Sequence, residues 1–165
     1  MEDFILAVVE VRDLTKRYGK HIAVEALSFT VEKGQIYGFL GPNGAGKSTT
    51  MNIMTGYLAP TDGEVLISGH DMMKDPEEAK QCIGYLPEVP PVYPDMTVSE
   101  YLKFAAELKH IPKGERKQNI LEVMELTKVT EVSERLIKNL SKGYRQRVGL
   151  AQAILGEPDV VILDE

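Results

Sequence analysis

The residues with the most specific chemistry form a glycine-rich octet at positions 41–48. It reads Gly41-Pro-Asn-Gly-Ala-Gly-Lys-Ser48 and matches G-x-x-x-x-G-K-[S/T], a pattern in which a loop holds nucleotide phosphates. The glycines let the backbone N–H groups face inward, and a helix beginning after them adds positive potential. We expect Lys47 to reach the β- and γ-phosphates and the Ser48 hydroxyl to bind Mg²⁺. The expected ATP contacts are Gly41, Pro42, Asn43, Gly44, Ala45, Gly46, Lys47, Ser48 and Thr49.

A second reactive group stands at the end of the printed sequence, where the apolar run 160–163 precedes two acids. The run predicts a strand buried on both faces, as in parallel sheets, and open parallel sheets bind ligands at the carboxyl ends of their strands. We expect Asp164 to hold Mg²⁺, usually through water, and Glu165 to polarise the attacking water as general base. Solvated acids ending a strand are the alternative for this pair alone; the phosphate loop upstream favours the catalytic interpretation.

The elements that must position these groups alternate between strands and helices. The run 36–40 predicts a strand before the phosphate loop, and a helical pattern begins near Lys47, so the context is more than a plain glycine turn. Other β-rich runs lie at 5–11, 27–31, 64–67, 83–86 and 160–163. This alternation predicts an α/β fold.

The pattern between residues 96 and 155 changes to helices, which predicts a helical insert within the α/β core. Its first helix should begin at a capping box, in which Thr97 and Glu100 satisfy each other's free amides. One face of that helix carries Tyr101, Phe104, Ala105 and Leu108. Packing within the insert is favoured for these four side chains over a dedicated binding stripe.

The composition bounds the remaining function classes. The chain has 165 residues, 43% hydrophobic and 27% charged, which suits one soluble domain with a real core. A net charge of −6 argues against a nucleic-acid partner, and the single Cys82 excludes an internal disulfide and fits a reducing compartment. The apolar run 4–9 is far too short to span a membrane and predicts a strand, so a membrane role would have to run through a partner.

The segment 140–148 reads LSKGYRQRV, and with it the chain resembles the ATPase of ATP-binding-cassette (ABC) transporters. The signature of that family is LSGGQ: Leu140, Ser141 and Gly143 match it, Lys142 replaces a glycine, and Tyr144 replaces the glutamine. The LSKGYRQR form resembles the branch that serves drug-export, antigen-export and gliding-motility transporters. The resemblance covers essentially the whole chain, with its motifs in the family's order.

The resemblance implies roles for several more residues. Ser141, Lys142, Gly143 and Tyr144 would meet the γ-phosphate of ATP held by a second subunit, because two cassettes pair head to tail around two nucleotides. Tyr18 occupies the position of an aromatic that stacks on adenine; such stacking tolerates other bases, so GTP is not excluded.

The family usually has a glutamine where this chain has Glu88. We expect Glu88 to retain the role of sensing Mg²⁺ and the attacking water, and its charge beside Asp164 and Glu165 adds like-charge repulsion. The proline-rich segment 89–94 would lie near the membrane subunit by the same resemblance, and a stiff surface loop is the equal alternative.

The fold implied is a P-loop ATPase core with a mostly parallel sheet, an antiparallel N-terminal β part and an inserted helical subdomain. We divide it into a β-rich and P-loop core at 1–87, the helical subdomain at 88–155 and the returning strand at 156–165. A histidine switch should follow Glu165, whereas His21, His70 and His110 all precede it. We therefore expect the 165 residues to be a fragment of a longer protein, truncated after Asp164 and Glu165, which end the Walker B motif of the family. Alone, this fragment should bind nucleotide weakly and hydrolyse it very slowly or not at all.

The main interpretation is the ATP-hydrolysing subunit of a membrane exporter, with ATP and Mg²⁺ as cofactors. Its expected partners are a transmembrane permease and a second ABC ATPase subunit, and its place is the cytoplasmic face of the membrane, reached through the permease. Two alternatives remain: a soluble ABC ATPase without transport, and a nucleotide-binding module without turnover.

Overall fold

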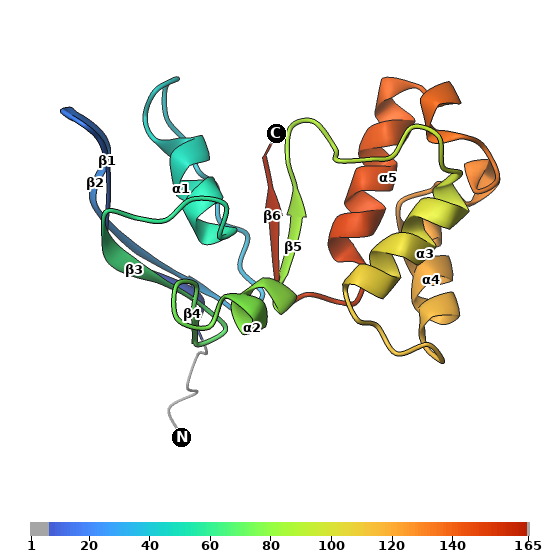
Figure 1. Ribbon diagram of the computed structural model, residues 1–165, viewed down its shortest axis with the longest axis horizontal. Helices are drawn as coiled ribbons and strands as arrows, with labels where there is room; N and C mark the ends of the chain where they lie inside the picture. The colour runs from blue at the N-terminus through green and yellow to red at the C-terminus, as the bar shows by residue number, and fades with distance from the viewer. Residues whose placement is uncertain (1–6, 165) are drawn as a thin grey trace. The chain divides into compact units, whose positions relative to one another are not determined.

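The computed structural model describes residues 7–164 of the chain (Figure 1). It divides into two compact units, Met1–Ile83 and Gly84–Glu165, and each is described here by itself. Among the helices of residues 7–164, none is long and apolar enough to cross a membrane.

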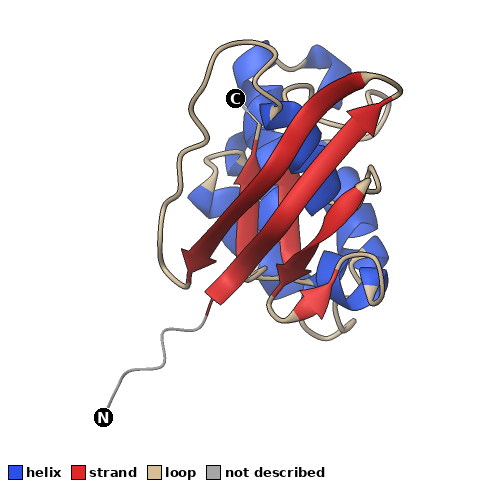
Figure 2. Ribbon diagram, turned by 90° about the vertical axis from the view of Figure 1, so that its left-hand side faces the viewer, coloured by secondary structure: helices blue, strands red, loops and turns tan. Residues whose placement is uncertain are grey.

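The first unit is built on an antiparallel sheet with the strand order β2-β1-β3-β4. Figure 2 shows its two long strands, β1 (Ala7–Tyr18) and β2 (His21–Glu32), which pair through a tight turn. The strands β3 (Asp62–Ile67) and β4 (His70–Asp71) follow. The predicted antiparallel N-terminal part is thus present, with strands longer than their apolar runs because the ladder extends into polar residues.

The core of this unit lies between the sheet and two helices, α1 (Lys47–Met54) and α2 (Pro76–Gln81). Cross-strand neighbours place apolar side chains on one face, as with Val9 opposite Ile67. Both of these residues are buried, and so is Ile53 of α1. The helix predicted to begin near Lys47 is confirmed, and packing of its apolar face fixes the loop that precedes it.

The strand predicted at 36–40 is wrong for the described residues, where this segment belongs to no ladder. Its side chains still alternate in direction: the rings of Tyr37 and Phe39 have centroids 5.2 and 5.3 Å from that of Phe29. Ile36 and Leu40 are almost fully exposed, and Tyr37 is 51% exposed despite its ring contact. Period-two alternation therefore survives without backbone pairing. A β-rich run becomes a strand only where another strand offers free N–H and C=O groups.

The second unit combines a two-stranded sheet with a helical subdomain. The strands β5 (Ile83–Leu86) and β6 (Val160–Leu163) run parallel, and their predicted bounds are confirmed (Figure 1). The expected burial of β6 on both faces is wrong, since Val161 is 42% and Leu163 is 53% exposed. Among the described residues β6 has a neighbour on one side only, so its apolar side chains are incompletely covered.

The helical subdomain holds α3 (Val98–Leu108), α4 (Arg116–Leu126) and α5 (Lys142–Ile154), with two 3₁₀ turns, η1 (Thr130–Val132) and η2 (Ile137–Asn139). The capping box at Thr97 and Glu100 is confirmed in both directions. The expected buried face needs a correction, because Leu108 is 63% exposed while Tyr101 and Ala105 are buried. Leu108 is the last residue of α3, and its side chain lies on the solvent side of the helix end.

Candidate functional site

The phosphate loop is held in place by the backbone geometry of Gly46. This residue is the N-cap of α1 and has a φ of 82°, in the left-handed region that favours glycine. A Cβ there would lie 2.4 Å from the carbonyl oxygen of Ala23 in β2. The loop therefore packs on the strand at a distance that only glycine permits.

This arrangement leaves backbone donors at the start of α1. The first hydrogen bonds onto the helix come from Thr50, whose amide and hydroxyl donate to the Gly46 carbonyl at 2.8 and 2.9 Å. The amides of residues 47–49 have no acceptor within the helix, because the first turn of any α-helix lacks one. Together with the helix dipole, these amides form an anion-binding end.

The Lys47 ammonium folds over the same loop. Its Nζ donates to the carbonyl oxygens of Gly41 at 2.6 Å and Pro42 at 3.0 Å. Both acceptors are exposed, so a phosphate oxygen can replace them without burying an unpaired carbonyl. The neighbouring Ser48 is exposed too, so its hydroxyl oxygen is accessible.

Tyr18 belongs to the same unit and lies at the turn of the β1–β2 hairpin. It pairs with His21 in the ladder, two residues before the Ala23 carbonyl that Gly46 approaches. Its side chain is 50% exposed, and the Lys16 ammonium lies 5.3 Å from the ring centroid. An accessible aromatic ring therefore stands at the end of the hairpin that also supports the phosphate loop.

The acidic groups Asp164 and Glu88 follow two neighbouring parallel strands. The Asp164 amide donates to the Leu86 carbonyl at 2.9 Å, so both residues leave the sheet at the carboxyl edge. The Glu88 carbonyl accepts a hydrogen bond from Gln146 Nε2 of α5 at 2.9 Å, while the residue as a whole is exposed. Glu165, the expected general base, lies outside the described residues.

The predicted Mg²⁺ ligands are divided between the two units, Ser48 in the first and Asp164 with Glu88 in the second. Within residues 7–164, no group of three or more histidine, cysteine or acidic side chains is gathered as a metal site. The predicted donors are nevertheless chemically suited to the cation, because hydroxyl and carboxylate oxygens are what Mg²⁺ prefers.

The segment at 141–144 opens helix α5. Ser141 is the N-cap, and its Oγ accepts a hydrogen bond from the Tyr144 amide at 3.3 Å. Lys142 and Gly143 are exposed, and the space beside Gly143 is open. A helix N-terminus with a hydroxyl and accessible amides is suited to an anion.

Two contacts in this subdomain could not be predicted from the sequence. The Tyr144 hydroxyl donates a hydrogen bond to Glu131 of η1, and Lys109 Nζ donates to the carbonyls of Ala153 at 3.0 Å and Leu155 at 2.8 Å. Burial lowers the pKa of Lys109 to about 8. In each contact the two partners lie on different elements. Their separation along the sequence therefore matches neither the helical nor the strand repeat.

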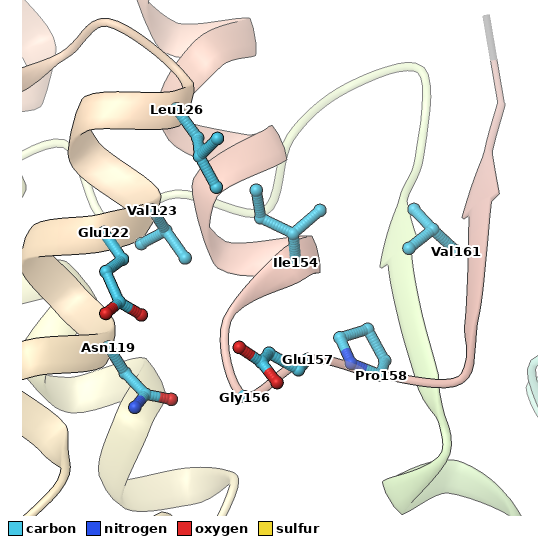
Figure 3. A pocket seen from close by; sticks show the side chains of 9 residues that line it. All are labelled: Asn119, Glu122, Val123, Leu126, Ile154, Gly156, Glu157, Pro158 and Val161. Atoms are coloured by element: carbon cyan, nitrogen blue, oxygen red, sulfur yellow. The ribbon is translucent and has the colours of Figure 1, made fainter.

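A hollow of about 230 Å³ in the second unit is a poor place for phosphates (Figure 3). Figure 3 shows Leu126 of α4, Ile154 of α5 and Val161 of β6 around it. Its charged lining residues, Glu122 and Glu157, are both acidic. A wall that combines apolar side chains with two carboxylates repels an anion.

Comparison with known proteins gives a consistent result. Residues 24–165 match the family described as ABC transporter. The chain is 39% identical over 158 residues to the bacitracin transport ATP-binding protein BcrA of Bacillus licheniformis, covering 96% of this chain and 51% of that protein. It is 34% identical to the linearmycin resistance ATP-binding protein LnrL of Bacillus subtilis (strain 168), with coverages of 96% and 51%. The chain thus spans about half the length of these curated relatives.

Solved structures agree with the sequence relatives. The fold matches a structure described as the ATP binding subunit of an ABC transporter, with a TM-score of 0.88 and 30% identity over 96% of this chain and 66% of that one. It also matches cbiO1 from Clostridium perfringens, part of the ABC transporter complex cbiONQ, with a TM-score of 0.84, 25% identity, and coverages of 96% and 65%.

Proposed function

This chain belongs to the ABC transporter family, and from that premise we propose that it binds and hydrolyses ATP with Mg²⁺ to drive a membrane exporter. The observation that carries the proposal is the phosphate loop, where Gly46 packs on β2 and α1 begins with free amides. The names of the relatives support transport: one serves bacitracin transport, and another is a probable multidrug transporter protein of Escherichia coli (strain K12). Linearmycin resistance, in a third name, favours export.

In the first unit, the loop 41–49 holds the phosphates and Tyr18 stacks on the base. Lys47 exchanges its carbonyl partners for the β- and γ-phosphate oxygens, and it neutralises charge that develops on the transferring group. Bound Mg²⁺ would supply further charge neutralisation, with Ser48 as one of its ligands.

In the second unit, Asp164 would hold the cation when it is bound, and Glu165 orients and deprotonates the attacking water. Glu88 senses the same cation, and its position after β5, beside Asp164 at the carboxyl edge of the sheet, supports this role. Its carboxylate in place of an amide adds negative charge near the phosphates, so activity depends more strongly on Mg²⁺ than it would with glutamine.

The segment 141–144 acts on the nucleotide of a second subunit. Ser141 and the first amides of α5 stabilise the γ-phosphate across a head-to-tail dimer, with Lys142, Gly143 and Tyr144 as the neighbouring signature residues. ATP closes this dimer and hydrolysis reopens it, which converts nucleotide chemistry into movement of the permease.

The surface that meets the permease is the loop 89–94, at the cytoplasmic face of the membrane. Val89 is 77% exposed, and Tyr93 is 53% exposed while its ring packs edge-on to Phe104 at 5.5 Å. The Tyr101 hydroxyl donates to the Pro91 carbonyl at 3.2 Å, which further ties the loop to α3. Exposed apolar residues on a supported loop favour a docking surface over a plain solvated connection.

The test uses the intact protein as its source cell makes it. We expect Lys47→Ala to lower ATP hydrolysis by at least about 100-fold, because charge stabilisation at the transferring group is lost. Glu165→Gln should abolish phosphate release while retaining ATP binding. The control is Lys33→Ala, an exposed lysine in a turn of the same unit, which should leave the rate within about twofold. A Lys47→Ala protein that hydrolyses ATP at the wild-type rate would contradict the proposal.

A further inference from the structure

Both the backbone and the side chain of Tyr144 form hydrogen bonds within its own subunit. Its backbone amide donates to Ser141 Oγ at 3.3 Å, and its hydroxyl donates to Glu131 Oε1 on η1. The ring packs against the buried core of the subdomain, and the Arg147 guanidinium lies 5.3 Å from its centroid. The amide, the ring and the hydroxyl of Tyr144 therefore each have a contact within the subunit.

The anchor at Glu131 is itself supported by the core. The next residue, Val132, is 3% exposed, and its amide donates to the Val129 carbonyl at 3.0 Å. Val129 is fully buried. The bond between Tyr144 and Glu131 thus joins the first turn of α5 to a turn that cannot shift without disturbing buried side chains.

The protonation of the hydroxyl suits this contact. The hydrogen bond to Glu131 raises the pKa of Tyr144, and the charges of Arg147 and Arg135 oppose that rise only in part. The phenol therefore stays protonated at neutral pH and acts as the donor. A carboxylate acceptor makes this a charge-assisted bond, which is stronger than a bond between neutral groups.

We infer that Tyr144 is a positioning residue: its hydroxyl, through Glu131, fixes the first turn of α5 and hence Ser141, and makes no contact with the nucleotide. The inference rests on the proposed function, in which Ser141 meets the ATP of the partner subunit. It also changes the role that the family resemblance implies for Tyr144, where the family glutamine would face the nucleotide. The hydroxyl is committed inside the subunit instead.

The kinetic test compares Tyr144→Phe, Glu131→Ala and the double variant in the intact protein. Each single change should raise the apparent KM for ATP about threefold to tenfold and leave kcat within about twofold, because a loose first turn weakens dimer closure. The double variant should be no worse than either single one, since both changes break the same bond. Tyr57→Phe and Glu134→Ala, exposed residues outside the pair, serve as controls and should change neither constant. Additive effects, or a damaging Tyr144→Phe beside a silent Glu131→Ala, would overturn the inference.

Amide hydrogen exchange without nucleotide gives a second readout that needs no ATP hydrolysis. The amides of Tyr144 and Arg145 bond to Ser141 Oγ and to the Ser141 carbonyl, the latter at 3.0 Å. Both single variants and the double variant should speed their exchange equally, by about threefold or more. Unchanged exchange in Tyr144→Phe would overturn the inference even if the protein hydrolyses ATP. If the wild-type protein hydrolyses no ATP but both variants still show faster exchange, the proposed function fails. The positioning role of the bond between Tyr144 and Glu131 is then still supported.

Discussion

At the scale of single residues, Gly46 shows how one missing side chain sets the geometry of a nucleotide loop. Two separate constraints meet there, a φ of 82° and the 2.4 Å approach of a virtual Cβ to the Ala23 carbonyl. The first constraint costs energy for any residue with a Cβ, and the second adds a collision with the backbone of β2.

A matched pair of variants separates these two constraints. Gly34 also has a φ of 82°, but a Cβ there meets nothing within 4 Å. We expect Gly34→Ala to cost about 1 kcal/mol in free energy of unfolding and Gly46→Ala about 2–3 kcal/mol, with loss of nucleotide binding in the latter only. Urea unfolding and titration with a fluorescent ATP analogue measure both effects. Equal costs for the two variants would show that the approach to β2 is not restrictive.

Glu88 is the second residue whose type changes the expected chemistry. It leaves the sheet beside Asp164, so two carboxylates share one edge. We expect Glu88→Gln to make ATP hydrolysis about threefold less sensitive to a reduction in Mg²⁺, because less negative charge needs to be neutralised. The Mg²⁺ and pH dependence of the rate in the intact protein measures this change, with Glu125→Gln as a control on the surface of α4. Identical profiles for wild type and Glu88→Gln contradict the role given to Glu88.

At the scale of elements, the helical subdomain is held together by contacts at helix ends. The capping box at the start of α3 pairs the Thr97 amide with Glu100 Oε2 at 2.8 Å and the Glu100 amide with Thr97 Oγ1 at 3.2 Å. At the other end of the same helix, Lys109 holds the last carbonyls of α5. A cation at a helix C-terminus stabilises the helix, because it interacts favourably with the helix dipole. The Lys109 ammonium is partly buried, however, and burial disfavours its charged form.

That cost predicts how stability depends on pH. The pKa of Lys109 is lowered by burial from 10.5 to about 8, so the unfolded chain binds more protons than the folded one between these values. The contribution of Lys109 to stability should therefore increase as the pH rises from 8 to 10.5, by up to about 3 kcal/mol.

Urea unfolding of wild type and Lys109→Met at several pH values tests this sign. The difference in free energy of unfolding, wild type minus variant, should grow in favour of wild type above pH 8. Lys117→Met, an exposed lysine on α4, is the control and should give a difference that does not change over this range. A Lys109 difference that is flat or falls with pH would show that burial does not govern this ammonium.

At the scale of the whole molecule, the two units have different tasks on the proposed mechanism. The first unit holds the nucleotide of its own subunit through the phosphate loop, whereas the segment 141–144 in the second unit acts on the nucleotide of the partner. A monomer without Mg²⁺ should therefore respond to ATP at the phosphate loop and not at the segment 141–144.

Amide hydrogen exchange of a monomeric sample tests this division. With ATP in EDTA, exchange at 41–50 should slow by about tenfold or more, because bound phosphates occupy the free amides of α1, while exchange at 141–147 should stay unchanged. The same sample without nucleotide is the reference. Protection at 141–147 in the monomer would mean that the segment binds the nucleotide of its own chain.

Much of the site could be predicted because its causes are local. The spacing of Gly41, Gly46 and Lys47 predicts a phosphate loop, and Thr97 with Glu100 predicts a helix start, because the groups that interact are within a few residues of one another. The strands at 83–86 and 160–163 also have their predicted bounds, since short apolar runs ended by turns indicate strands directly.

Only the tertiary structure decided which of these segments pair and which side chains are covered. The run 36–40 has strand propensity but pairs with no strand among residues 7–164. Val161 and Leu163 of β6 stay exposed, and so does Leu108 at the end of α3. Tyr144 bonds to Glu131, and Lys109 bonds to Ala153. In both cases the two residues lie on different elements, so their separation along the chain matches neither the helical nor the strand repeat. The sequence by itself determined the motifs of the family and the local helix starts, because these depend on neighbours along the chain. Burial and pairing depend on residues that meet only after folding, so no local pattern could report them.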